Sequence, residues 1–323
     1  MGRDSFTQLV FSCKLSWCLR LLTIAFTVAY LCIWSIPWKP CCDGVVILGM
    51  HRSGTSAIAG MLSMRGLHLG SVDSLLPPKP DNTLGFFERI DVMQANDLLM
   101  RFQNITWDSK THKYDADRSL TIELNATNFS PGLNALRFFK HPTNHPFLMK
   151  DPRLSITLKV WLRLLGTKPA VLFTYRHPLE VALSLHRREN HTIDKSLRLW
   201  YVYNRRAIQQ SEHLCRVITS YSRLLSHPKD ETDRLSRELS NACGIKIAHS
   251  AADVFINSTL YHERVDFKTD PCSSRIAFPS DKWANPSDNE RSVYERVIDA
   301  YCAMEKGDAF KPEFEWDETL DDS

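Results

Sequence analysis

The sequence predicts an α/β fold, a three-layer sandwich in which helices cover both faces of a central parallel sheet. Short and fully apolar runs such as GVVIL and AVLFTY are typical of strands that are buried on both sides. Segments with helical periodicity separate these runs, and alternating strands and helices are typical of a parallel sheet. With 323 residues and 43% hydrophobic composition, the chain is large enough for one such domain with additional segments.

The expected elements follow one another along the chain. Strands are expected at residues 44–48, 146–150, 170–175 and 216–221. Helices are expected at residues 55–64, 91–102, 158–165, 179–188, 195–214 and 229–241. Three prolines and a glycine make residues 75–87 a loop, and the polar stretch 103–146 indicates an irregular surface insertion. The acidic end of the chain, residues 311–323, predicts a disordered tail in solvent.

Residues 17–36 differ from the rest of the chain because they are almost entirely apolar. Their one charge, Arg20, lies near one end, and as a helix they would be roughly 30 Å long, enough to span a bilayer. More basic residues precede or begin this run than follow it closely, which places residues 1–16 in the cytosol. We expect an uncleaved transmembrane signal anchor, with a cleaved signal peptide or a buried core helix as the alternatives.

Sequons and cysteines agree with that topology. Five Asn-X-Ser/Thr sequons follow the apolar run, at Asn104, Asn125, Asn128, Asn190 and Asn257. They favour a glycoprotein of the Golgi or another secretory-pathway membrane, with residues 44–310 as a lumenal domain. The six cysteines after the run form an even set, which is consistent with disulfides of unknown pairing or with buried thiols.

The stretch GMHRSGTS, residues 49–56, connects the first strand to the first helix. Its two glycines match the phosphate-binding loop G-x-x-x-x-G-K-[ST], so the expected fold is P-loop NTPase-like. A threonine occupies the lysine position, and Arg52 supplies a cation that can hold two oxygens of a terminal group. The residues expected to bind the anion are Gly49, Arg52, Ser53, Gly54, Thr55 and Ser56. A structural glycine turn is the alternative.

A second anion site is expected where the strand 170–175 ends. Arg176 follows that strand, and Ser184 comes two helical turns later, so both side chains can converge on a phosphate at the carboxyl edge of the sheet. Two anion sites indicate a nucleotide that is phosphorylated at two places. The alternative is that Arg176 pairs with Glu180 or with another acid.

These two stretches resemble the 5′-phosphosulfate loop and the 3′-phosphate motif of sulfotransferases that use 3′-phosphoadenosine 5′-phosphosulfate. MKDPRLSITLKVW, residues 149–161, resembles the K-D-P segment of tyrosylprotein sulfotransferases and maps their lysine, which contacts the transferring group, onto Lys150. PDNTLGFFE, residues 80–88, is similar to a segment of bacterial sulfotransferase-domain proteins, and residues 217–228 resemble a later strand and loop of the family.

The resemblance covers residues 44–241 in matching order, with two departures. Ser222 stands where the family has an acid, and the glutamate that tyrosylprotein enzymes carry after the loop helix has no counterpart between Arg65 and Leu76. Peptide specificity is therefore not implied, and residues 242–323 match nothing in the family.

The resemblance implies a membrane-bound enzyme that moves a sulfuryl group from 3′-phosphoadenosine 5′-phosphosulfate to a hydroxyl of a glycan, with a peptide or lipid less favoured. Arg52 and Lys150 would neutralise charge on the transferring group without a metal ion. Glu88 would be the general base, by resemblance to carbohydrate sulfotransferases with a glutamate near two aromatic residues. Capping of the next helix is the alternative role of Glu88, and Asp81 and His51 are the other candidate bases.

Asp151 could be read as a magnesium ligand, but we expect it to pair with Arg153 or with a helix end. Two other functions stay open: a P-loop kinase of small molecules, and a silent membrane protein that only binds nucleotide or glycan. The missing lysine of the phosphate-binding loop argues against the kinase. The presence of all four expected ligand-binding side chains, which are Arg52, Lys150, Arg176 and Ser184, argues against the silent protein. A net charge of +3 gives no support to a nucleic-acid binder.

Overall fold

The computed structural model describes residues 42–80, 82–248, 272, 283 and 286–321. The predicted cytosolic tail 1–16 and membrane segment 17–36 lie outside these residues. Within the described ranges, no helix has both the length and the apolar character that crossing a bilayer requires.

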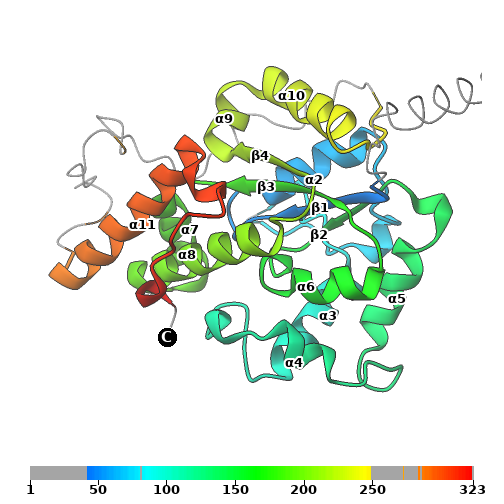
Figure 1. Ribbon diagram of the computed structural model, residues 1–323, viewed down its shortest axis with the longest axis horizontal. Coiled ribbons are helices and arrows are strands. Elements are labelled where there is room, and N and C mark those ends of the chain that lie inside the picture. The colour runs from blue at the N-terminus through cyan, green and yellow to red at the C-terminus, as the bar shows by residue number, and fades with distance from the viewer. Residues whose placement is uncertain (1–41, 81, 249–271, 273–282, 284–285, 322–323) are drawn as a thin grey trace, which may run out of the picture. The chain divides into compact units, whose positions relative to one another are not determined.

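Four parallel strands form the central sheet, in the order β2-β1-β3-β4 (Figure 1). The strands are β1 (Gly44–Leu48), β2 (Phe147–Lys150), β3 (Ala170–Tyr175) and β4 (Arg216–Ser220). Every residue of β1, β2 and β3 is buried, as the apolar runs predicted. The register pairs Ile47 with Lys150 and Leu48 with Phe173, so the loops after β1, β2 and β3 leave the sheet at the same edge.

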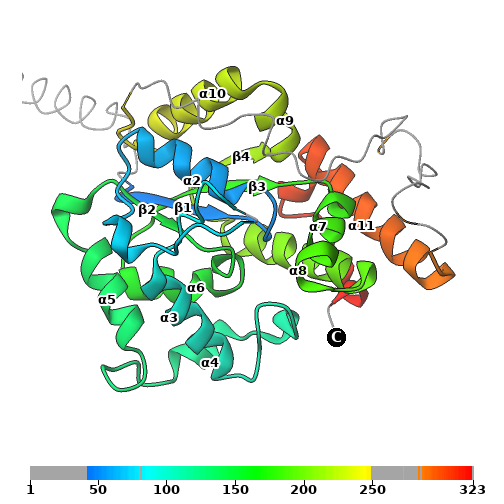
Figure 2. The same cartoon turned by 180° about the vertical axis from the view of Figure 1, so that it is seen from behind.

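Helices cover both faces of this sheet, which confirms the predicted α/β layers (Figures 1 and 2). Alternate β1 residues face opposite layers: Val45 and Ile47 pack in one hydrophobic cluster, and Val46 and Leu48 pack in the other. The layer that includes Val45 contains α2 (Thr55–Met64), α9 (Tyr221–Ser226) and α10 (Pro228–Asn241). The layer that includes Val46 contains α3 (Ile90–Arg101), α5 (Ser130–Phe139), α6 (Leu154–Leu165), α7 (Pro178–Glu189), α8 (Ile193–Gln210) and α11 (Asp288–Lys306).

The remaining helical segments within the described ranges are short. They are α4 (Ala116–Leu120) and the 3₁₀ turns Val72–Ser74, Thr111–Lys113, Pro142–Asn144, Asp308–Phe310 and Glu318–Leu320.

The segment 103–146 is not the irregular surface insertion that its polarity predicted. Helix α5 lies within it and packs against α3 and α6, with Leu136 and Phe139 buried. Phe129, just before the helix, is fully buried as well. The apolar side chains of this segment are few, but those of α5 lie on one face of the helix. The average polarity of the segment does not reveal this pattern.

The prediction of a disordered tail at residues 311–323 is also wrong over its described part. Leu320 is fully buried, and Phe314 and Trp316 pack against the core. The backbone N–H of Asp317 donates to the hydroxyl of Tyr201 on α8. The apolar residues between the acids bind this segment to the domain, because burying them outweighs the preference of the acids for solvent.

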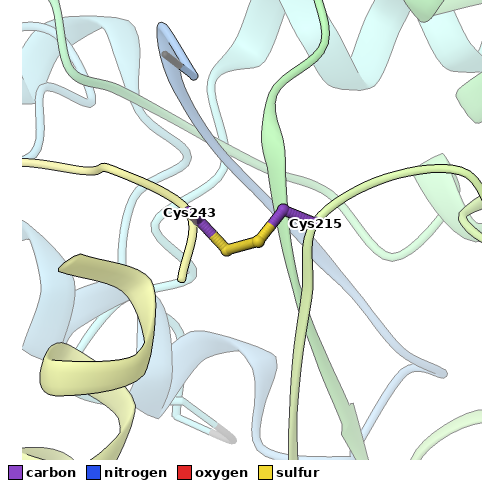
Figure 3. The surroundings of a disulfide bond; sticks show 2 residues. All are labelled: Cys215 and Cys243. Carbon is purple, nitrogen blue, oxygen red and sulfur yellow. A yellow bond between two sulfur atoms is a disulfide. The ribbon is translucent and has the colours of Figure 1, made fainter. Parts of the chain in front are cut away.

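Two disulfides among the described residues pair four of the six cysteines whose pairing the sequence left open. Cys215, just before β4, is bonded to Cys243, just after α10 (Figure 3). Cys272 is bonded to Cys302 on α11. Each bond joins residues about 30 positions apart in the chain, and so closes a loop of intermediate size.

Candidate active site

A pocket of about 530 Å³ opens at the carboxyl edge of the sheet, among the loops after β1, β2 and β3 and residues 76–79 and 82–88. Its lining contains six basic residues and two carboxylates: Arg52, Lys79, Lys150, Arg153, Arg176 and Arg188, with Glu88 and Glu189. Ligands of open α/β sheets bind at this edge, and an excess of positive charge favours an anion there.

The loop between β1 and α2 is held tightly by its neighbours. Gly49 and Gly54 have φ angles of 149° and 85°. A Cβ on Gly49 would lie 2.3 Å from the carbonyl oxygen of Thr174, and one on Gly54 would lie 2.2 Å from the ring of Tyr221. Packing alone therefore accounts for both glycines, and the cations around the loop, rather than the glycines, indicate an anion site.

The first turn of α2 lies on the pocket wall. Gly54 is the N-cap residue and offers no side chain to the first-turn N–H groups, and Thr55 and Ser56 line the pocket. Uncapped N–H groups at the positive end of a helix attract an anion. Ser53 is different: it is fully buried, its N–H donates to the oxygen of Met50, and its own carbonyl accepts from the hydroxyl of Thr174. Its role is to fix the loop.

Lys150 and Glu88, which the sequence predicts as catalytic residues, both line the pocket and contact each other. The Nζ of Lys150, the last residue of β2, lies 2.5 Å from Oε1 of Glu88 and 3.1 Å from Oγ of Ser56. It also donates to the carbonyl oxygen of Phe86 at 2.9 Å. The side chains of the pair are only 1% and 8% exposed. Burial raises the pKa of Glu88, and the nearby ammonium opposes that shift.

Glu88 does not cap the helix that follows it, which was its alternative role. Helix α3 begins after Arg89, and the carboxylate of Glu88 binds Lys150 instead. Asp151 pairs with Arg153, as expected: its Oδ1 accepts from the Arg153 backbone N–H at 2.8 Å, and the two side chains lie 3.2 Å apart.

The side chains of Arg176 and Ser184 do not converge on one point, as two residues that bind the same phosphate would. The Nε of Arg176 lies 2.8 Å from Oε2 of Glu180, which is the pairing that the sequence left open as an alternative. Ser184 is 1% exposed, and its Oγ accepts a hydrogen bond of 2.9 Å from Nε of Arg52. Arg176 does line the pocket, and its Nη1 lies 3.4 Å from the carbonyl oxygen of Arg52.

The other two candidate bases are in weaker positions than Glu88. His51 is 8% exposed and packs with its ring centroid 4.6 Å from that of Trp107. Burial first, and then the charge of Arg153, lowers the pKa of His51 well below its usual value, so its imidazole is a weak base at neutral pH. Asp81 lies outside the described residues.

Three basic residues of the lining were not predicted from the sequence to belong to the site: Lys79, Arg153 and Arg188. Arg153 had a readable signal, because it follows β2 by three residues at the edge where three strands end. Its guanidinium is 2.9 Å from Asp97 as well as near Asp151, so the arginine is held in place from two sides. Among the residues that the structure describes, no group of three or more His, Cys, Asp or Glu residues is placed to hold a metal ion.

No protein-family model matches the chain, and no curated protein matches it. Among the solved structures that are similar to it, two match over most of its length. A sulfotransferase domain from the curacin biosynthetic pathway is 13% identical, with 86% of this chain and 95% of that chain covered and a TM-score of 0.43. A sulfotransferase domain from the Synechococcus PCC 7002 olefin synthase is 15% identical, with 82% and 96% covered and a TM-score of 0.42. Both similarities are weak, and neither assigns this chain to a family.

Proposed function

We propose that this chain is a sulfotransferase that moves a sulfuryl group from 3′-phosphoadenosine 5′-phosphosulfate to a hydroxyl of a glycan. The observation that supports it most is the contact of Lys150 with both Glu88 and Ser56, in a pocket that Arg52 also lines. This contact joins a carboxylate, a cation and the first turn of α2 at one point, and the sequence resemblance assigns this reaction to the same residues.

In the proposed reaction the acceptor oxygen attacks the sulfur and the bond from sulfur to the 5′-phosphate oxygen breaks. The hydroxyl proton passes to the carboxylate of Glu88, which acts as the general base. Negative charge develops on the oxygen of the departing adenosine 3′,5′-bisphosphate. Lys150, Arg52 and the N–H groups at the start of α2 stabilise that charge.

The donor is proposed because its two anionic ends match two parts of the pocket. The phosphosulfate would lie against Arg52 and the first turn of α2, and the 3′-phosphate against Arg176. The glycan acceptor is proposed from the resemblance of the residues around Glu88 to carbohydrate sulfotransferases. A peptide or a lipid hydroxyl is the less favoured acceptor.

Transfer of radiolabelled sulfur tests this function. Full-length protein in detergent is incubated with labelled donor and a panel of glycans, peptides and lipids, with the Lys150→Ala variant as the matched control. We expect label in a glycan with the parent protein and a loss of roughly 10²- to 10³-fold with the variant. Mg²⁺-dependent phosphate transfer from ATP to an acceptor, with no sulfur transfer, would instead favour the kinase.

We further propose that the domain is lumenal, in a Golgi or other secretory-pathway membrane. The two disulfides support an oxidising compartment, and Asn104 and Asn190 are exposed and available for glycans. Glycosidase treatment should therefore shift the expressed protein on a gel, and intact vesicles should protect the domain from protease. Cleavage of the domain in intact vesicles would reverse the orientation.

A further inference from the structure

Two aspartates hold Arg153 in the pocket wall and leave one of its nitrogens for a ligand. The Nε of Arg153 lies 2.9 Å from Oδ1 of Asp97, and its Nη1 donates to both carboxylate oxygens of Asp151 at 3.2 Å. No described residue accepts a hydrogen bond from Nη2, the third nitrogen of the guanidinium. Because Arg153 lines the pocket, the two N–H groups of this nitrogen can donate to a molecule bound there.

Helix α3 fixes Asp97 against the start of α6. The side-chain oxygen of Asn96, the residue before Asp97, accepts from Oγ1 of Thr157 at 2.8 Å and from the indole N–H of Trp161 at 2.7 Å. All three of these side chains are fully buried. Arg153 is the N-cap residue of α6, the helix that carries both donors. Both partners of the contact between Asp97 and Arg153 are therefore anchored, and the arginine has a fixed direction.

Arg153 and Arg176 lie on opposite sides of the loop after β1. The strand order is β2-β1-β3, Arg153 follows β2, and Arg176 follows β3. Neighbouring strands are roughly 5 Å apart, so the two arginines follow strands about 10 Å apart. In the proposed reaction the 3′-phosphate lies against Arg176 and the phosphosulfate against the loop after β1. The side of β2, where Glu88 and Lys150 lie, is left for the acceptor.

The charge of Arg153 is already balanced. Asp97 and Asp151 supply two carboxylates for one guanidinium, and even with Asp97 protonated the other carboxylate would balance it. The lining beside them includes two apolar residues: Met93, one helical turn before Asp97, and Pro152. This part of the wall therefore offers hydrogen-bond donors and apolar surface without excess positive charge. A neutral sugar matches it, whereas a carboxylate or a sulfate ester would meet the aspartates.

We propose that Arg153 is a specificity-determining residue that binds an oxygen of the acceptor, and that the acceptor is a neutral sugar. Its Nη2 donates to a hydroxyl or ring oxygen beside the reactive hydroxyl, and the two aspartates disfavour sugars that carry an acid. The proposal rests on the proposed function, because it takes Arg52 and Arg176 as the residues that bind the donor. It adds the charge class of the acceptor and a residue that recognises it.

Matched pairs of sugars test the proposal. Methyl glucoside and methyl galactoside are each compared with the uronic acid that differs only at C6. Affinities are measured by saturation-transfer NMR on full-length protein in detergent, with adenosine 3′,5′-bisphosphate bound. The parent should bind a neutral sugar at least roughly fivefold more tightly than its acid. Arg153→Lys keeps a cation for the aspartates but has no Nη2. It should weaken the neutral sugar by roughly tenfold and leave bisphosphate affinity unchanged.

A change of charge provides a second arm. Asp97→Asn keeps the oxygen that contacts Arg153 and removes the negative charge, so the acidic sugar should bind roughly fivefold more tightly and the neutral sugar should change little. Asp194→Asn is the matched control. The side chain of Asp194 is 28% exposed against 27% for Asp97, pairs with Arg198 at 3.0 Å and does not line the pocket. This control should leave both affinities unchanged.

Other results overturn the proposal. If the parent binds the acid more tightly, or Asp97→Asn leaves the ratio of the two affinities unchanged, the acceptor is not selected for neutrality. If Arg153→Lys weakens the bisphosphate, Arg153 belongs to the donor site, and if it changes no affinity, Arg153 only packs. A parent that binds the bisphosphate but no sugar contradicts this inference alone, whereas one that binds no bisphosphate contradicts the proposed function. Should Arg153→Lys fail to fold, Asp97→Asn and its control decide the result.

Discussion

Burial and the neighbouring Lys150 act in opposite directions on the pKa of Glu88. The carboxylate is buried, and burial alone would favour its protonated form, but Lys150 at 2.5 Å favours the ionised form. A raised pKa makes the carboxylate of Glu88 a stronger base toward the proton of a hydroxyl. The same pairing makes each residue dependent on the other, because removal of one leaves a buried charge without its partner.

Glu88→Gln should lower turnover by roughly 10²- to 10⁴-fold while it leaves nucleotide affinity nearly unchanged, because a general base acts on the acceptor rather than on the donor. Initial rates and calorimetry on the same preparation separate the two effects. Glu189→Gln is the matched control, since it removes the other carboxylate of the pocket lining and should keep turnover close to that of the parent. A Glu88→Gln variant that stays nearly as active as the parent would assign the base to another residue.

Sequence reasoning located the pocket but not every bond in it. Arg52, Lys150 and Glu88 reach the same pocket because the loops after β1 and β2 leave one edge of the sheet, which motif order alone predicts. The order of the motifs does not predict which hydrogen-bond partner each arginine has. Arg176 has an acid one helical turn away and pairs with it, and the buried Ser184 is engaged by Arg52.

The N-cap residue of helix α7 is His177, a titratable group, so the stability of the protein should depend on pH through this helix. The Nδ1 of His177 accepts from the N–H of Leu179, and its ring lies 5.0 Å from that of Tyr301. Burial first, and then the charge of Arg176, lowers the pKa of His177 to about 3. His177 is therefore protonated near pH 6.5 in the unfolded chain, but only near pH 3 in the folded protein.

The contribution of His177 to stability should be complete above about pH 6.5 and should be lost as the pH falls toward about 3. His177→Asn keeps a cap acceptor that does not titrate. It should flatten the fall in unfolding free energy by up to about 1.4 kcal/mol per pH unit over that range. Urea unfolding at several pH values measures the slope. Equal slopes for parent and variant would show that this histidine carries no such proton linkage.

At the scale of elements, the strands and most of the helices between them could be predicted from the sequence, but α9 and α11 were not predicted. The predicted bounds of β1, α2 and β3 agree with the structure residue for residue, because each combines a continuous apolar run or helical period with a clear boundary. Helix α11 was missed although it has a signal, a capping box between Ser287 and Glu290 before apolar residues at helical spacing. Helix α9 is only six residues long, too short to show a period.

At the scale of the whole molecule, the disulfide Cys215–Cys243 ties β4 to the end of α10 across a separation of 28 residues (Figure 3). Replacing both cysteines with alanine should lower the unfolding free energy by about 3 kcal/mol, because the unfolded chain gains freedom. Cys215 precedes β4, at the edge of the sheet opposite the pocket, so nucleotide affinity should be unchanged. Unfolding curves without reductant measure the effect. An unchanged midpoint would contradict the stabilising role of this bond.

The central claim is that the pocket recognises a nucleotide with phosphates at two places and no metal ion. Calorimetric titration of the full-length protein in detergent tests it most directly, with adenosine 3′,5′-bisphosphate in EDTA against ATP with Mg²⁺. The account predicts that the bisphosphate binds at least roughly tenfold more tightly, since a charged hydrogen bond to Arg176 is worth about that factor, and that Arg176→Ala removes most of the preference. Tighter binding of ATP that depends on Mg²⁺, with no binding of the bisphosphate, would contradict it.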